Sequence, residues 1–320
     1  MKIKYLLLAF MLLSASVMRS QQLMLYEVME CPVKDSATIL FVSLSGSDES
    51  ATGQKDTLDL GDVANITKRY FPISRMQRQR FLKRVGMSET DSVFIYDYAL
   101  NTLLTRSVRD LPMVACLDEY LYPGQLHTTA DYMIGFLIDK SLLSSFREKV
   151  NGRYSYDVGN TLVNVGKANP FIRGPLKPMI WTEMQPELFP ADTITIEDSL
   201  SIAKWYNQVT IKAYECKVDS FRFVARDRMY QANVVGRSLQ VFNLKTGARI
   251  FKHFTLETES ISPVHLNTSE TEIPQLRMGP LFKGKAPALL WLEWHSFGCM
   301  SVYLLDPSGE TIPIRCDNRH

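Results

Sequence analysis

Two histidine–cysteine pairs near the C-terminus are the residues whose types and spacing most directly suggest chemistry. His295 precedes Cys299, and Cys316 precedes His320 at the same interval. Two thiolates and two imidazoles could coordinate a zinc ion. Alternatively, Cys299 could act as a nucleophile with His295 as its base, or the two cysteines could form a disulfide.

The residues between the cysteines predict a β-hairpin. Asp306-Pro307-Ser308-Gly309 is a strong turn sequence, because proline suits the second position and glycine the fourth. Closing the hairpin at this turn would pair Cys299 with Cys316 and Tyr303 with Ile312. Facing β-carbons on neighbouring strands lie about 4.5–5.5 Å apart, which is close to what a disulfide requires.

The same register predicts one largely apolar face, shared by Cys299, Cys316, Tyr303, Leu305, Ile312 and Ile314. On regular strands four residues span about 13 Å, so the histidines would lie too far from the thiols to share one zinc ion. The thiol catalyst lacks a recognisable nucleophile motif. We therefore predict a disulfide and no cofactor, and the alternative is a metal site made of His295, Cys299, Cys316 and His320.

A basic segment is the second candidate site. Its cations are Lys68, Arg69, Arg75, Arg78, Arg80, Lys83 and Arg84. Such a cluster could bind an acidic polysaccharide, a phosphorylated lipid headgroup or an acidic partner protein. Runs of charge also occur on solvated helix faces that bind nothing. If this segment binds a ligand, we expect salt-sensitive binding to an anionic polymer of the cell envelope.

Other residues give weaker signals of chemistry. The sequence contains no P-loop, dinucleotide fingerprint or His-Glu-x-x-His motif. Trp291 and Trp294 flank Glu293 in a predicted strand and could stack on a sugar ring. Burial of a tryptophan in the core would give the same pattern.

The N-terminus predicts export from the cell. Lys2 and Lys4 precede an apolar run at 6–13, and small residues follow directly. This order is typical of a secretory signal peptide, which we place at residues 1–20. The apolar run is too short to cross a bilayer of about 30 Å, and no lipobox cysteine follows it. We expect a secreted or periplasmic protein without a transmembrane segment after cleavage.

Export places the cysteines in an oxidising compartment. Cys31, Cys116 and Cys216 remain after the predicted disulfide, and the sequence leaves their pairing open. Asp-Ser or Asp-Thr followed by an apolar residue occurs at Asp35, Asp56, Asp91, Asp192 and Asp198. The tripeptide resembles an O-glycosylation acceptor of the bacterial periplasm, although Asp and Ser also favour turns before strands.

Composition is that of an ordinary globular protein. Hydrophobic residues make up 46% of the chain and the net charge is +2, so we expect no nucleic-acid partner. A mature chain of about 300 residues suits one large domain. We assign residues 21–320 to a single β-rich domain, and a proline-bearing stretch near residue 190 is the alternative boundary.

Alternation of apolar and polar residues predicts antiparallel strands over most of the chain. The clearest block, 209–254, contains three or four strands with turns at 217–220 and at Thr246-Gly247. Further strands are expected at 23–28, 38–44, 93–98, 132–138, 161–165, 178–181, 288–295, 299–305 and 311–316.

Helices are expected in two places. The first covers 74–86, with Ser74 as its N-cap and Gly86 at its C-terminal end. Its predicted buried stripe consists of Met76, Phe81, Leu82 and Val85. A second short helix is expected at 195–206.

These elements predict a mainly β fold with a small helical insert near 74–86. The leading architecture is an antiparallel, propeller-like meander, and the alternative is a β-sandwich. Pro313 favours an edge strand at the C-terminus, which argues against closure by an N-terminal strand beside it.

The functional hypothesis is an exported, non-enzymatic binding or structural protein of the bacterial cell envelope. Its partner would be an anionic envelope polymer or another envelope protein. The alternative is a secreted, glycosidase-like hydrolase whose carboxylates come together only in the folded chain.

Overall fold

The structure of the chain is a computed structural model. It describes residues 23–32, 38–45, 60, 63, 68–118, 121, 125–142, 160–190, 208–231, 233–256, 261, 264–266, 275–293 and 299–316. The predicted signal peptide at 1–20 and the predicted helix at 195–206 lie outside the described residues.

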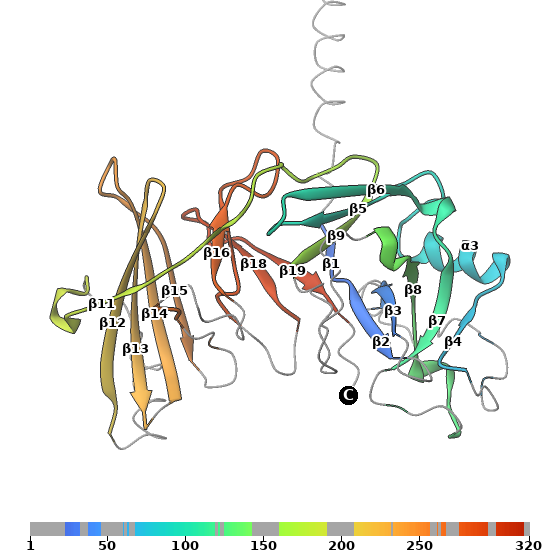
Figure 1. Cartoon of the computed structure of the whole chain (residues 1–320), viewed down its shortest axis with the longest axis horizontal. Coiled ribbons are helices and arrows are strands. Elements are labelled where there is room, and N and C mark those ends of the chain that lie inside the picture. The colour runs from blue at the N-terminus through green and yellow to red at the C-terminus, as the bar shows by residue number, and fades with distance from the viewer. Residues whose placement is uncertain are drawn as a thin grey trace, which may run out of the picture.

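The described strands form one nine-stranded sheet and two five-stranded sheets, which confirms a mainly antiparallel β fold (Figure 1). The strand pairing does not show a propeller, because one sheet runs through nine strands instead of dividing into four-stranded blades. Short 3₁₀ helices connect some strands: η2 (Val108–Asp110), η3 (Thr129–Asp131), η4 (Lys140–Leu142) and η5 (Pro186–Leu188).

The nine-stranded central sheet joins distant parts of the chain. Its order is β10 (Lys177–Pro178), β16 (Arg277–Gly279), β17 (Ala288–Leu290), β18 (Ser301–Leu304), β19 (Thr311–Arg315), β1 (Leu25–Tyr26), β9 (Thr161–Gly166), β5 (Ser92–Asp97) and β6 (Thr102–Ser107). β1 pairs with β19 in parallel and with β9 in antiparallel fashion. Within the described strands, β1 therefore links the C-terminal hairpins to the β9-β5-β6 block.

The expectation that Pro313 marks an edge strand is wrong. β19 lies between β18 and β1, and Pro313 is paired opposite Ser301. The ladder with β1 involves Ile314 and Arg315, so it starts just beyond the proline. Proline has no backbone N–H, but β18 does not need one at this position. The next residue, Ile314, makes the hydrogen bond to β18, because its N–H donates to the Met300 carbonyl oxygen.

The first five-stranded sheet packs against the β9-β5 side of the central sheet. It has the order β2 (Met29–Pro32), β3 (Thr38–Ser43), β8 (Tyr132–Ile138), β7 (Met113–Leu117) and β4 (Tyr70–Pro72), and helix α3 (Arg75–Arg84) follows β4. Phe81 of α3, Phe136 of β8 and Ile95 of β5 belong to one buried cluster. Helix, outer sheet and central sheet therefore share a hydrophobic core.

α3 matches the predicted helix in its ends but differs in its faces. Ser74 forms a capping box with Gln77, and Gly86 has a φ of 72°. Phe81 and Leu82 are buried as predicted, but Met76 is 64% exposed. Met76 lies on the opposite side of the helix because residues 78, 81, 82 and 85 form the inward stripe at i, i+3, i+4 and i+7. No helix among the described residues is both long and apolar enough to span a membrane.

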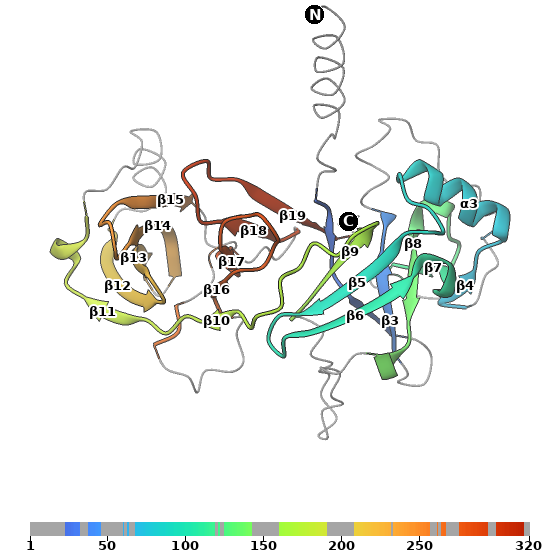
Figure 2. The same ribbon diagram turned by 90° about the horizontal axis from the view of Figure 1, so that it is seen from above.

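The second five-stranded sheet curls strongly (Figure 2). It consists of β11 (Thr182–Met184), β12 (Thr210–Val218), β13 (Phe221–Tyr230), β14 (Asn233–Asn243) and β15 (Arg249–Leu256), which confirms the strands predicted in 209–254. Its inner face carries Phe223 and Val241, which pack with Met278 and Leu289 of the central sheet. Register shifts in β13–β14 and β14–β15 increase local twist and help the sheet to curl.

Both turns predicted in this sheet are present. Val218 pairs with Phe221, so Asp219 and Ser220 form a two-residue turn, and Asp219 adopts a φ of 53°. Gly247 has a φ of 70°, and its N–H donates to the Asn243 carbonyl oxygen.

One Asp-Ser tripeptide, starting at Asp91, is described. The Asp91 carboxylate accepts a hydrogen bond from the Ser88 N–H at 2.8 Å, directly before β5. This is the turn-forming role that Asp favours. The tripeptides that start at Asp35, Asp56, Asp192 and Asp198 lie outside the described residues.

Gly135 provides a test of the packing between β8 and β3. A β-carbon at this position would lie 1.9 Å from the Val42 carbonyl oxygen, whereas nothing lies within 4 Å of one at Gly174. We expect Gly135→Ala to lower the free energy of unfolding by about 3 kcal/mol or to prevent folding. Gly174→Ala, the control, should change it by less than about 0.5 kcal/mol in chemical denaturation. Equal stability of the two variants would contradict the described packing.

Candidate functional site

The C-terminal hairpin forms, but its predicted register is wrong by one residue. Val302 pairs with Ile312 and Tyr303 with Thr311. The slip arises at the turn, where Gly309 adopts a φ of 65° and the Leu304 N–H donates to the Glu310 carbonyl oxygen. Leu305 is thereby left out of the ladder, and one extra residue enters the loop.

This register overturns the predicted single apolar face. Val302 and Ile312 pack in the cluster formed by the central sheet itself. Tyr303 and Leu305 belong instead to the cluster beneath the curled sheet. β18 therefore has apolar neighbours on both faces, whereas β19 buries Ile312 and Ile314 on one face and exposes Thr311 and Pro313 on the other. The one-residue shift places Ile312 beside Val302 instead of Tyr303 and so changes the face that it shares.

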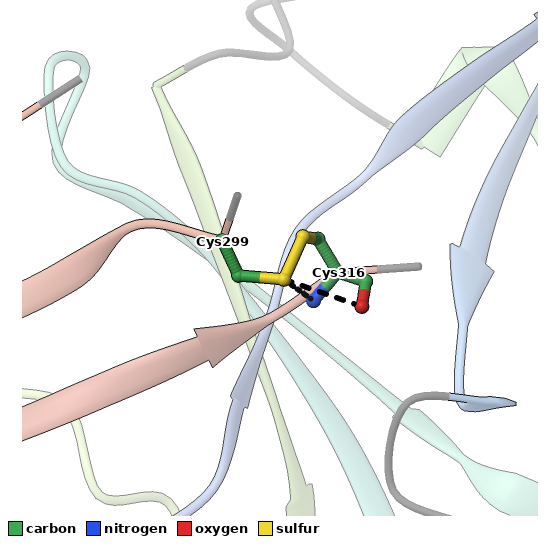
Figure 3. Close-up of a disulfide and its surroundings, with 2 residues drawn as sticks. All are labelled: Cys299 and Cys316. Carbon is green, nitrogen blue, oxygen red and sulfur yellow. Dashed lines mark hydrogen bonds between the residues drawn. A yellow bond between two sulfur atoms is a disulfide. The ribbon is translucent and has the colours of Figure 1, made fainter. Parts of the chain in front are cut away.

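Cys299 and Cys316 nevertheless lie at disulfide distance, in agreement with the predicted pair (Figure 3). Their Cα atoms are 5.4 Å apart, within the usual range for a disulfide. The bridge lies just beyond the last ladder pair of β18 and β19 and closes a loop with a sequence separation of 17. On the chain-entropy model such a loop stabilises the fold by about 3 kcal/mol.

The alternative zinc site and the thiol catalyst both need residues that the structure does not place. His295 and His320 lie outside the described residues, and the described residues contain no cluster that could hold a metal ion. Both thiol groups are used by the bridge, so neither is available as a nucleophile.

The remaining three cysteines are buried. Cys31 and Cys116 lie in one hydrophobic cluster of the first five-stranded sheet, and Cys216 lies beneath the curled sheet. Burial raises the pKa of Cys216 to about 11, which disfavours the reactive thiolate.

The basic segment divides into exposed and structural cations. Lys68, Arg75, Arg80 and Lys83 are exposed, and the last three lie on the outer face of α3 with Met76. We call Arg75, Met76, Arg80 and Lys83 the α3 outer face. These side chains can contact a ligand without any change in the fold.

Arg69, Arg78 and Arg84 face the protein instead. Arg78 donates to the Glu89 carboxylate at 2.7 and 2.8 Å and to the Leu111 carbonyl oxygen at 2.7 Å. The buried Arg69 donates to the Leu121 carbonyl oxygen, and the Arg84 guanidinium lies 5.6 Å from the Phe81 ring centroid. These three cations hold α3 and its flanking segments in place.

A polar cluster that sequence reasoning missed occupies the inner face of the curled sheet. Cross-strand pairing places Lys212, Asp227, Arg237 and Thr255 in one row across β12–β15. Asp227 accepts two hydrogen bonds from Arg237, at 2.6 and 2.7 Å, and both side chains are 2% exposed. Period-two alternation identifies the strands, but it does not predict which inward positions are charged.

Glu293 connects this row to the central sheet. Its carboxylate contacts His253 Nε2 at 2.9 Å and accepts hydrogen bonds from Thr255 Oγ1 at 2.7 Å and from the Tyr303 hydroxyl. Burial opposes the ionisation of Glu293, but the hydrogen bonds from His253, Tyr303 and Thr255 outweigh it and lower its pKa to about 2. Burial first, and then the bond to this carboxylate, raise the pKa of Tyr303.

This arrangement is suited to joining sheets rather than to proton transfer. A general acid of a glycosidase needs a carboxyl group with a raised pKa, whereas Glu293 stays ionised. His253 and Thr255 belong to β15, and Tyr303 belongs to β18. The ionised carboxylate therefore ties the curled sheet to the central one.

Of the two tryptophans predicted to stack on a sugar, the structure describes Trp291. β17 ends at Leu290, and Trp291 adopts a φ of 64°, so the strand does not continue to Glu293. The Trp291 indole N–H donates to the Tyr98 hydroxyl at 2.8 Å. Trp294 lies outside the described residues.

Comparison with known proteins gives no family for this chain. No protein-family model matches it, and no curated protein or solved structure matches it.

Cysteine labelling tests the disulfide. The denatured, unreduced protein should take up three alkyl groups, on Cys31, Cys116 and Cys216. Reduction before labelling should raise the number to five, the cysteine content of the chain. Intact-mass measurement distinguishes these states. Five labels on freshly purified, unreduced protein would contradict the bridge.

The pH dependence of stability tests the Glu293 cluster. A carboxyl whose folded pKa is lowered from 4.5 to about 2 stabilises the fold above pH 4.5, and this contribution is lost as the pH falls through 2. We expect Glu293→Gln to lower the free energy of unfolding at pH 7 by about 3 kcal/mol and to flatten the curve between these pH values. The exposed Glu183→Gln is the control, and identical pH profiles for both variants would exclude the proposed link.

Proposed function

We propose that this chain is an exported, non-enzymatic binding protein of the bacterial cell envelope and that it holds an anionic polymer on the α3 outer face. The order of basic, apolar and small residues at the N-terminus supports export. The observation that carries the binding proposal is the cluster of Arg75, Arg80 and Lys83 on the exposed side of one rigidly anchored helix.

The anchoring of α3 supports a binding surface more than a flexible charged tail. The capping box at Ser74 fixes its start, and Phe81 and Leu82 bury its inner side. Arg78 is held by Glu89 and by backbone carbonyl groups. The outer cations therefore project from a fixed backbone, which lowers the entropy lost when a ligand binds.

The carboxylate cluster supports a non-enzymatic role. Asp227, which is buried, is paired with Arg237, and the largely covered Glu293 is engaged by His253, Thr255 and Tyr303. We also infer a sandwich-like stack of sheets instead of a propeller ring. Such a stack would leave α3 on the outside of one end, open to a long polymer.

Retention on a sulfated-polysaccharide column tests the proposal. We expect the Arg75→Ala, Arg80→Ala, Lys83→Ala triple variant to elute at clearly lower salt, with affinity at least about tenfold weaker, because exposed charges bind through screened attraction. The control removes the same charge elsewhere, at the exposed Lys167, Lys245 and Lys252. Equal elution of the two triple variants would refute the α3 site.

A further inference from the structure

Arg69 carries a buried positive charge that no carboxylate balances within the described part of the chain. The residue is 8% exposed, and its Nη1 atom donates to the Leu121 carbonyl oxygen. Its Nε and Nη2 atoms are buried and have no hydrogen-bond partner among the described residues. A guanidinium group keeps its proton in proteins, so it cannot relieve the cost of burial by losing its charge. Arg69 therefore attracts an anion to its Nε–Nη2 edge.

The same edge of other arginines in this protein binds carboxylates. Arg78 donates from Nε and Nη2 to Glu89 at 2.7 and 2.8 Å. Arg237 donates from the same two atoms to Asp227 at 2.6 and 2.7 Å. Two parallel N–H groups match the two oxygens of one carboxylate. Arg69 presents this pair of donors, so a carboxylate fits it better than an anion of another shape.

A second buried donor lies in the same row of the first five-stranded sheet. The Leu117 N–H donates to the carbonyl oxygen of Arg69, which directly precedes β4, and Leu117 pairs with Tyr132 of β8. Tyr132 is 2% exposed, and its hydroxyl has no hydrogen-bond partner in the parts of the chain that the structure describes. The rings of Tyr132 and Phe71 of β4 lie 5.3 Å apart, so the Tyr132 side chain leans over β7 toward β4.

The surroundings of these donors are apolar. One hydrophobic cluster contains Tyr132 together with Leu60, Val63, Phe71, Leu117 and Leu121. Leu60, Phe71 and Leu121 are half-buried, so the cluster borders the surface and a small ion can enter. One cation in apolar surroundings balances one negative charge, whereas a dianion such as sulfate would bring an unpaired buried charge.

We propose that Arg69 and Tyr132 form a binding site for an organic monocarboxylate with an apolar body. Their backbones are two strands apart, which is about 10 Å, so two long side chains can reach one ligand above Leu117. Nε and Nη2 of Arg69 donate to the two carboxylate oxygens, and the Tyr132 hydroxyl donates to one of them. The body of the ligand packs against the apolar cluster. This site takes one small ion and is independent of the polymer proposed for the α3 outer face.

NMR of the arginine Nε–H groups in the full mature chain at pH 7 tests the proposal, with acetate as the probe and acetamide as its neutral match. At constant ionic strength we expect the Arg69 Nε–H resonance, assigned through its own backbone, to shift saturably with acetate. Acetamide should bind at least about tenfold more weakly. The Arg237 Nε–H, already bonded to Asp227, is the internal control and should not shift.

Equal affinities for acetate and acetamide, or no shift with acetate, would overturn the proposal. This comparison requires no variant, so it decides the matter even if a substitution impairs folding. Butyrate should bind at least about fivefold more tightly than acetate, because two further methylene groups become buried. Equal affinities for the two acids would exclude the apolar body, and tighter binding of inorganic phosphate than of butyrate would exclude a carboxylate site.

Arg69→Gln supplies the second arm, with Arg109→Gln as its matched control, since Arg109 is exposed. Acetate should raise the thermal unfolding midpoint of the wild-type chain and of the control equally, because it binds the folded state. It should not raise the midpoint of Arg69→Gln, and Tyr132→Phe should need at least about threefold more acetate for the same rise. An unchanged acetate response in a folded Arg69→Gln would overturn the proposal.

Discussion

The insertion of β1 between β19 and β9 is the constraint on which the rest of the fold depends. Leu25 and Tyr26 are fully buried, and their backbones pair on one side with the last described strand and on the other with β9. Leu25 belongs to the core of the C-terminal hairpins, and Tyr26 belongs to the core shared with α3. Two residues thus join the two hydrophobic cores of the central sheet, and the disulfide fixes the hairpin beside them.

The polar cluster of Glu293 provides the corresponding junction on the other side. There the central sheet meets the curled sheet through an ionised carboxylate with three protein partners, above a shared apolar cluster. Buried charges need such partners, because an unpaired carboxylate would be strongly disfavoured in the core. The molecule is therefore held by strand pairing at one junction and by directional polar contacts at the other.

Sequence patterns identified what depends on local rules. The alternation of apolar and polar residues predicted strands β12–β15, and the capping residues predicted both ends of α3. The spacing of the cysteines around the turn predicted the disulfide. β7 was missed: all its residues are buried, so no alternation marks it, although the equally buried β9 was predicted. The hairpin register depends on one extra loop residue. The exposure of Met76 follows because Arg78, and not Met76, faces the protein. Packing decides both. The Glu293 cluster joins β15, β18 and the segment that follows β17, and no local pattern encodes such a contact.

Hydrogen exchange measured by mass spectrometry on Leu25→Ala tests the central role of β1 most directly. Leu100→Ala is the control, since Leu100 is 49% exposed. Truncation of a buried leucine costs about 2–5 kcal/mol, and the account predicts that this loss appears equally in the protection of β18–β19 and of β5–β9. Loss of protection on one side alone, or on neither side, would contradict the view that β1 unites the two halves of the sheet.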